Sequence, residues 1–238
     1  MEELEIRRRE IIRYLGYKKA DDVDERTKGI IEESISEIMG VIEPRYIYDT
    51  FPIEWKENSL SFAGINVTSE DLTKNLKGCD SVVMLAVTIG HGFDKLIRRA
   101  EISDMSKAYI LQATGTEVVE AWCNKINSLI SADFLNKGLY TRPRFSPGYG
   151  DLPLEMQRDF ENVLHMRKNI GISLSDGTVM SPTKSVTAVI GLTSTPDEGK
   201  FGDAESQGKS GEGESEVSAK CKDCRISDKC SYSDKCYM

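Results

Sequence analysis

The sequence has no long apolar run and no excess of positive charge, and both absences exclude classes of protein. No apolar stretch approaches the roughly 18 residues that a membrane-spanning helix needs, so we expect no membrane segment. Lysine and arginine number 31 against 39 aspartate and glutamate residues, which gives a net charge of −8. This balance argues against a general nucleic-acid-binding protein, because such proteins present a basic surface. The first residues, MEELEIRRREIIR, lack the apolar core of a signal peptide, so we expect a cytoplasmic protein.

Histidine is also scarce, with only His91 and His165 in the chain. Neither lies near a cysteine or serine in a catalytic arrangement, so little supports a hydrolytic triad. Apolar residues nevertheless make up 39% of the 238 residues, which is enough to build a core.

The composition changes sharply towards the end of the chain. We expect a folded body over residues 1–193 and an acidic, Gly- and Ser-rich linker over 194–220. The linker holds too few apolar side chains to offset the entropy of ordering it, so we expect it to be disordered. A Cys-rich tail follows over 221–238.

Four of the six cysteines lie in that tail: Cys221, Cys224, Cys230 and Cys236. Disulfides are rare in a reducing cytoplasm, and four thiolates can hold a Zn²⁺ ion or an iron–sulfur cluster. The C-x2-C pair is a good half-site, but the longer spacings match no standard zinc knuckle. The identity of the metal therefore stays open, and a reduced tail without metal is the alternative.

Hydrophobic periodicity predicts a body that mixes helices and strands. The run SVVMLAVTI over 81–89 is almost continuously apolar and is typical of a buried central strand. Other strands are expected over 45–51, 60–67, 170–174 and 185–192, and helices over most of the first 42 residues and over 69–78, 93–99, 104–131 and 154–164. The buried stripe of the long helix should comprise Ala108, Leu111, Gly115, Val118, Val119, Trp122, Ile126 and Leu129.

The stretch RPRFSPGYGD over 142–151 is the most informative for function. Its prolines and glycines fix an unusual backbone path. Arg144 offers a planar fork of donors suited to a carboxylate or phosphate. Gly148 allows a close approach of the backbone to a ligand, and Tyr149 can stack on a ring. A surface turn in which the arginine pairs with a nearby aspartate is the alternative.

The long helix carries a second candidate, Glu120, within ATGTEVVEAW. Its carboxylate can complement a cationic ligand, although a solvated or salt-bridged glutamate explains it equally. Gly115 in mid-helix costs about 1 kcal/mol relative to alanine, so we expect a packing or site reason for it. The turn Gly90-His91-Gly92 is only a fragment of a phosphate-binding fingerprint.

The stretch over 142–157 resembles the AdoMet-binding signature of the activation (reactivation) domain of cobalamin-dependent methionine synthase. The signature Arg-x-x-Pro-Gly-Tyr or a close variant appears here from Arg144 to Tyr149. Downstream, a Gly-Ile-x-Leu-Ser strand over 171–175 and a Met-x-Pro-x-x-Ser-Val stretch over 180–186 look similar too. The resemblance is to short stand-alone versions of the domain and spans about residues 11–192.

This resemblance implies an α+β, C-shaped domain with a twisted antiparallel sheet flanked by helices. It implies that the domain binds AdoMet and supports reductive methylation of cob(II)alamin, with an electron from a flavoprotein. Arg144 then corresponds to the arginine that holds the AdoMet carboxylate, and Glu120 to a helix carboxylate of the site. Ser146, Pro147, Gly148 and Tyr149 form the remaining ligand loop.

The chain lacks the D-x-H-x-x-G motif of corrinoid-binding modules, so cobalamin must come from a partner. The leading hypothesis is therefore a reactivation protein that acts in trans on a corrinoid methionine synthase, with a reductase as a further partner. The alternatives are a non-catalytic partner of a corrinoid protein and an electron-transfer accessory with a four-cysteine metal site. Neither nucleic acid nor a membrane is an expected partner.

Overall fold

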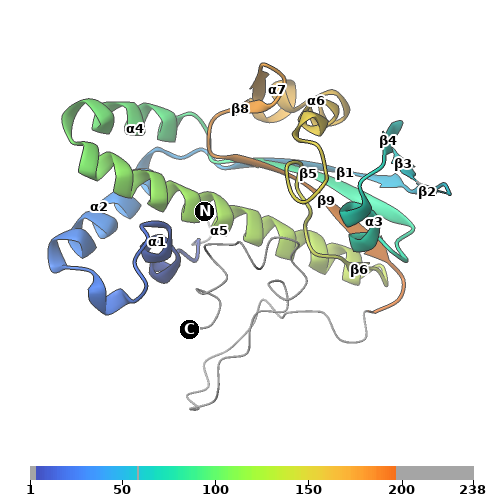
Figure 1. The fold of residues 1–238 in the computed structure, drawn as a ribbon, viewed down its shortest axis with the longest axis horizontal. Helices are drawn as coiled ribbons and strands as arrows, with labels where there is room; N and C mark the ends of the chain where they lie inside the picture. The colour runs from blue at the N-terminus through green and yellow to red at the C-terminus, as the bar shows by residue number, and fades with distance from the viewer. Residues whose placement is uncertain (1–3, 58, 197–238) are drawn as a thin grey trace, which may run out of the picture. The chain divides into compact units, whose positions relative to one another are not determined.

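A four-stranded antiparallel sheet lies at the centre of the computed structural model, which describes residues 4–57 and 59–196 (Figure 1). The strand order is β1-β5-β9-β6. The strands are β1 (Arg45–Pro52), β5 (Ser81–Thr88), β9 (Ser185–Thr193) and β6 (Tyr140–Thr141). Strand β5 pairs along its whole length with β1 on one side and β9 on the other. The antiparallel sheet and the α+β class predicted from the sequence are confirmed.

Strand β5 is buried on both of its faces, which explains its continuous apolar sequence. Its odd-numbered residues Val83, Leu85 and Val87 belong to an apolar cluster with one long helix. Its even-numbered residues pack in a separate cluster against the opposite helices. Alternation of apolar and polar residues appears only where one face of a strand meets water, and here neither face does.

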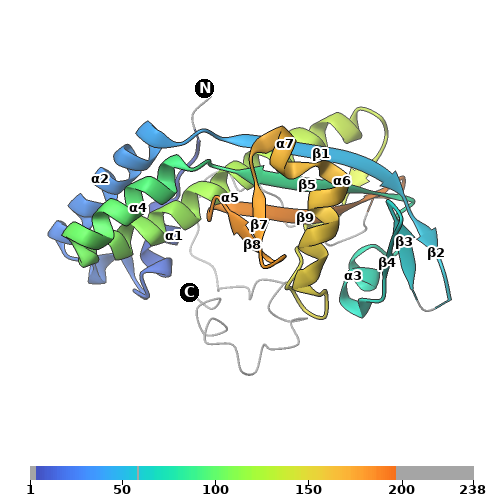
Figure 2. The same cartoon turned by 90° about the horizontal axis from the view of Figure 1, so that it is seen from above.

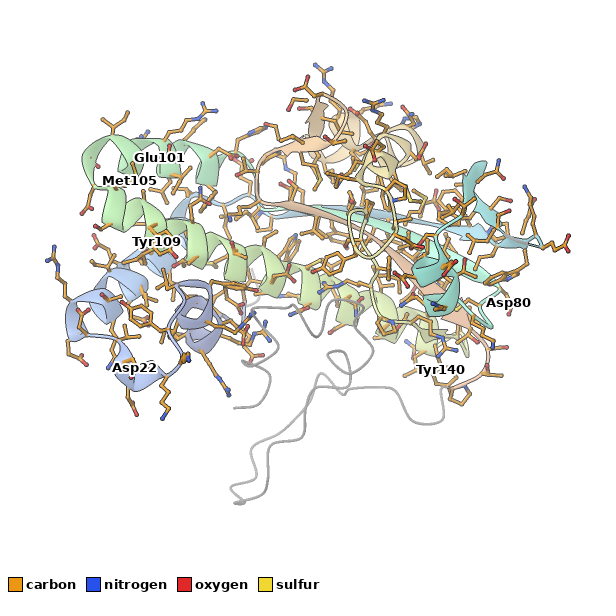
Figure 3. The ribbon with its side chains drawn as sticks, viewed as in Figure 1. Asp22, Asp80, Glu101, Met105, Tyr109 and Tyr140 are labelled. Carbon is orange, nitrogen blue, oxygen red and sulfur yellow. The ribbon has the colours of Figure 1, made fainter. Side chains whose placement is uncertain are left out.

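Helices cover the two faces of the sheet (Figure 2). The long helix α5 (Met105–Leu135) lies on one face, and α6 (Gln157–Leu164) and α7 (Met166–Ile170) lie on the other. Figure 3 labels Met105 at the start of α5 and Tyr140 of β6 near its far end. The Asp104 carboxylate caps α5 by accepting from the Lys107 amide at 3.1 Å.

Three more helices pack around the first half of α5: α1 (Arg8–Tyr14), α2 (Glu25–Val41) and α4 (Gly92–Ser103). Their apolar side chains form a third core cluster, which lies largely outside the sheet. Gly115 of α5 has a packing role here, because a Cβ atom would collide with the Phe93 ring of α4.

The remaining described elements are short. A hairpin of β7 and β8 precedes β9, and a small antiparallel sheet of β2, β3 and β4 leads into helix α3. Their bounds are β2 Glu54–Trp55, β3 Leu60–Phe62, β4 Ile65–Val67, α3 Glu70–Asn75, β7 Ser173–Ser175 and β8 Val179–Ser181, with 3-10 turns at Ala20–Asp22 and Leu154–Met156. Within 4–57 and 59–196, no helix combines the length and apolar character needed to cross a bilayer.

Two local predictions are wrong. The strand expected over 170–174 begins only at Ser173, because α7 continues to Ile170 and Gly171 ends it with a φ of +75°. Leu129 is 52% exposed rather than buried, because Ile130 takes its place against the sheet. The proposed linker falls almost entirely, and the Cys-rich tail wholly, outside the described residues.

Candidate functional site

The loop over 142–151 leaves the sheet through a β-bulge. Thr141 pairs with Leu192 of β9, and Phe145 pairs with Val189. The loop therefore advances by four residues between these two pairs while β9 advances by only three. One extra residue is therefore accommodated around Pro143, which has no amide hydrogen to donate. Bulges redirect side chains, and the two arginines of this segment consequently diverge.

Arg142 and Arg144 point to different parts of the molecule. The Arg142 guanidinium reaches the Lys77 carbonyl at 3.4 Å, just beyond helix α3. Arg144 instead reaches helix α5, where its Nη2 donates to the Asn124 Oδ1 at 2.9 Å. The bulge thus brings Arg144 to the helix that carries Glu120.

Arg144 and Glu120 form a loose ion pair. Their closest nitrogen and oxygen atoms are 3.5 Å apart, beyond the range of a normal hydrogen bond. The Arg144 side chain is only 22% exposed, and its Nη1 is buried without a hydrogen-bond partner among the described residues. An unsatisfied buried donor is costly, and an acceptor from a ligand would satisfy this one.

The thiol of Cys123 lies beside this pair but is chemically inert. Burial raises its pKa to about 11, while the Arg144 charge opposes the shift and the Glu120 charge adds to it. At neutral pH the group is therefore a protonated thiol and not a nucleophile.

The sequence motif after Arg144 folds into a tight turn. Pro147 is buried, and Gly148 adopts a φ of +89° while its amide donates to the Leu152 carbonyl at 2.9 Å. The Tyr149 amide donates to the carbonyl oxygen of the half-buried Ser146 at 3.1 Å. The Tyr149 side chain is 70% exposed. An exposed aromatic ring on a rigid turn is available for stacking on a ligand ring.

Asp151 anchors the end of this loop, a role that the sequence analysis missed. Its carboxylate accepts from the amides of Glu70 and Asp71 at 2.7 and 3.2 Å and from the Ser69 hydroxyl. These groups lie at the start of α3. Their hydrogen bonds lower the Asp151 pKa, and the bond from Ser69 has the largest effect. The loop is therefore held at both ends, by β9 and by the start of α3.

A second carboxylate on α5, Glu117, was not predicted as a paired group. It is fully buried and accepts the Arg7 Nε at 3.0 Å, the Arg7 Nη2 at 3.4 Å and the Arg7 backbone amide at 3.1 Å. Burial raises the Glu117 pKa, against the opposing effect of Arg7. Ala113 and Ala121, one turn to either side, are also buried, and this stripe of small residues is the signal that marks Glu117 as internal.

Helix α1 borders the region around Glu120. Burial raises the pKa of Tyr14 in α1, and the charges of Glu120 and Glu117 add to this effect while Arg13 opposes it. The predicted residues Glu120, Arg144, Ser146, Pro147, Gly148 and Tyr149 thus come from two segments, which the ion pair between Arg144 and Glu120 joins.

No cluster of three or more potential metal ligands occurs within 4–57 and 59–196. The predicted ligands Cys221, Cys224, Cys230 and Cys236 lie outside the described residues. Cys79 and Cys123 are both buried free thiols.

Residues 63–202 match the family described as vitamin B12 dependent methionine synthase, activation domain. The chain belongs to this family. The matched range of the activation domain contains Glu120 and the whole loop over 142–151. The resemblance drawn from the loop motif is therefore confirmed at the level of the family, while the roles of individual residues stay predictions.

Among solved structures, the chain is similar to the MetH reactivation domain bound to AdoHcy. The TM-score is 0.56 with 15% sequence identity over 70% of this chain, so the likeness concerns the fold. The match spans 64% of that chain, which is less than two thirds of its length. No curated protein matches this sequence.

Proposed function

We propose that this activation-domain protein binds AdoMet beside Arg144 and supports reductive methylation of cob(II)alamin in a corrinoid-dependent methionine synthase. The synthase acts as a separate partner in the cytoplasm, and a reductase supplies the electron. The observation that carries the proposal is the buried Arg144 Nη1, which lacks an acceptor among the described residues. A carboxylate supplies such an acceptor, and Arg–carboxylate pairs are among the strongest hydrogen-bonded contacts in proteins.

The other site residues match the rest of the ligand. Glu120 is half-buried within 3.5 Å of Arg144, so it can face the ammonium group that lies next to the carboxylate of an amino acid. The turn from Ser146 to Tyr149 offers backbone groups and an exposed ring to the nucleoside. MetH, whose reactivation domain has this fold, was solved with AdoHcy, the demethylated form of the same ligand.

Positioning is the contribution that these residues make to the reaction. Bound AdoMet supplies a methyl group, which cobalamin accepts after one-electron reduction, leaving AdoHcy. Arg144 and Glu120 fix the amino-acid end of the donor, and the anchored turn fixes its nucleoside end. No proton transfer is needed in such a step, which agrees with a site built from an ion pair and a turn rather than from an acid–base pair.

Calorimetry of AdoMet against the wild type and Arg144→Ala tests the binding site. We expect binding to the variant to be about 100-fold weaker, or about 2.7 kcal/mol, because the buried carboxylate contact is lost. Arg142→Ala is the matched control, since this arginine of the same loop points towards Lys77 and should leave the affinity almost unchanged. Equal affinities of Arg144→Ala and the wild type would overturn the assignment.

A second experiment tests the reaction itself. The protein is mixed with a cob(II)alamin-loaded synthase, a reductant and labelled AdoMet, and the cobalt spectrum is followed. Formation of labelled methylcobalamin supports reactivation in trans. Stable association with the corrinoid protein without methyl transfer would instead favour a non-catalytic partner.

The Cys-rich tail stays a predicted metal site. Metal analysis of protein purified without oxygen distinguishes the two metal sites that the tail could form. Zinc indicates a structural site, and iron with sulfide indicates an electron-transfer accessory. A colourless protein without metal would contradict both.

A further inference from the structure

The structure contains a cavity of about 380 Å³ that shares no residue with the Arg144 site. It lies between the end of α2, the start of β1, one face of α4 and the end of α7. Arg45, Lys95 and Arg99 line it, together with the apolar side chains of Leu96, Ile170 and Pro182. The volume falls within the range of pockets that hold small molecules.

The positive charges of this cavity are largely unneutralised. Among the described residues, Glu43 is the only acidic one that lines it, and its carboxylate already accepts from the Arg45 guanidinium at 2.9 Å. The side chains of Lys95 and Arg99 form no hydrogen bond or ion pair with any residue in the described part of the chain. They lie one helical turn apart on the exposed face of α4, where like charges repel each other.

This arrangement runs against the composition of the protein. The chain carries a net charge of −8, so a concave surface with three cations and one carboxylate is a local exception. A ligand with more than one negative charge would remove the repulsion between Lys95 and Arg99. A concave surface lined mainly by one sign of charge also strengthens the attraction for such a ligand.

The turn Gly90-His91-Gly92 forms one wall of the cavity. A Cβ atom at Gly92 would collide with the Val41 carbonyl at the end of α2, so glycine lets the two helices approach closely. Gly90 has a φ of +84° and packs against Glu43. The glycines seen in the sequence therefore shape the cavity by helix packing, without the complete phosphate-loop motif.

We propose that this cavity binds a small organic phosphate. The phosphate would contact Lys95 and Arg99 at the α4 face, because a dianion matches two free cations and arginine recognises phosphate oxygens with a planar fork. The organic part would lie against Leu96, Ile170 and Pro182. The proposal is independent of AdoMet binding, since the two sites have no residue in common.

The test uses phenyl phosphate as the probe, with phenol as its neutral counterpart. Binding is measured by calorimetry and by NMR shifts on the full chain, for the wild type and for Lys95→Gln/Arg99→Gln. We expect saturable binding of phenyl phosphate to the wild type, weakening by about tenfold or more in the double variant. Phenol should bind neither protein measurably.

Arg98→Gln is the matched control, because Arg98 is exposed on the same helix but does not line the cavity. It should bind phenyl phosphate like the wild type, and all variants should keep the wild-type AdoMet affinity and melting temperature. The proposal is overturned if phenyl phosphate does not saturate the wild type, or if it binds the double variant equally well. It is also overturned if small phosphates fail to bind while the double variant loses docking to an acidic protein partner.

Discussion

Two arginine–glutamate pairs lie less than one helical turn apart on α5, and they differ in how completely they are satisfied. In the Arg7–Glu117 pair the acid is fully buried, and it receives three hydrogen bonds from Arg7. In the Arg144–Glu120 pair the base is the more buried partner, and one of its terminal nitrogens has no acceptor among the described residues. The first pair is complete without a ligand and the second is not, although the charges are the same.

This difference distinguishes a structural ion pair from the proposed binding site more clearly than charge alone does. Burying a charge is tolerated when each of its polar atoms has a hydrogen-bond partner, because the lost hydration is then replaced. Glu117 meets that condition and fastens the N-terminal segment to α5. Arg144 does not meet it, so a ligand can complete its hydrogen bonds.

The largest expected effect is on stability, from Arg7→Met. The change removes the positive charge and both side-chain hydrogen bonds and leaves only the backbone amide of residue 7 on the buried Glu117 carboxylate. It should lower the free energy of unfolding by about 3 kcal/mol at pH 7. Glu117→Gln in the same background should restore part of the loss. Arg7 opposes the burial effect that raises the Glu117 pKa, so its removal should raise that pKa further. The deficit should therefore shrink as the pH falls and Glu117 of the variant becomes protonated.

Urea unfolding at several pH values measures this effect. Arg8→Met is the control, because its pair with Glu32 is exposed on both sides and should contribute about 0.5 kcal/mol or less. A stability loss in Arg7→Met no greater than in the control would show that Glu117 does not depend on its partner.

The Lys184 ammonium contacts α5 and extends the comparison, because it forms no ion pair with a carboxylate in the part of the chain that the structure describes. The Lys184 Nζ donates to the Gln112 carbonyl at 3.2 Å and the Thr116 hydroxyl at 2.8 Å. Burial lowers the pKa of Lys184 to about 8, with a smaller opposing effect of Asp94. The lysine is thus held by neutral acceptors, and its charged form is destabilised by the loss of hydration.

Lys184→Met should remove a pH dependence of stability. Above about pH 8 the folded state releases the Lys184 proton, while the unfolded chain keeps it until the pH nears the ordinary lysine pKa of 10.5. The free energy of unfolding therefore rises with pH between these two values. The wild type should gain about 2–3 kcal/mol there relative to Lys184→Met. Lys168→Met, a change at an exposed lysine of α7, should keep the rise, and the same curve for both variants would contradict the prediction.

The sequence predicted the loop motif and the main strands because these depend on local signals. Proline and glycine spacing fixed the turn from Ser146 to Tyr149, and the apolar run over 81–89 marked the central strand. Whether Glu117 or Glu120 faces Arg144 depends on the packing of α1 and on a one-residue bulge around Pro143. The bulge leaves no periodic pattern, and the small residues around Glu117 mark it as internal without naming its partner. The sequence therefore singled out Glu120 but not the surroundings of either glutamate.

Asp151 illustrates the same limit. A loop aspartate after a glycine is a common turn residue, and nothing in its neighbours reveals that it accepts from the start of a helix about 80 residues earlier. Contacts between distant segments are set by the fold as a whole. The sequence therefore identified the residues of the turn but not the group that anchors it.

The smallest expected effect comes from Glu120→Gln, which tests the open pair from its acidic side. The variant keeps the shape of Glu120 but removes its charge, so AdoMet should bind about fivefold more weakly, or about 1 kcal/mol. Because Glu120 lies near the guanidinium that we propose to bind the carboxylate, it should face the neighbouring ammonium group, which AdoHcy also carries. Calorimetry should therefore show the same loss of affinity for both ligands, whereas a loss confined to AdoMet would place Glu120 near the sulfonium.

Unfolding of Glu120→Gln by urea should show no change beyond about 0.5 kcal/mol, because this side chain is 37% exposed. A larger loss of stability with unchanged affinity would make the Arg144–Glu120 pair structural, like the neighbouring pair of Arg7 and Glu117.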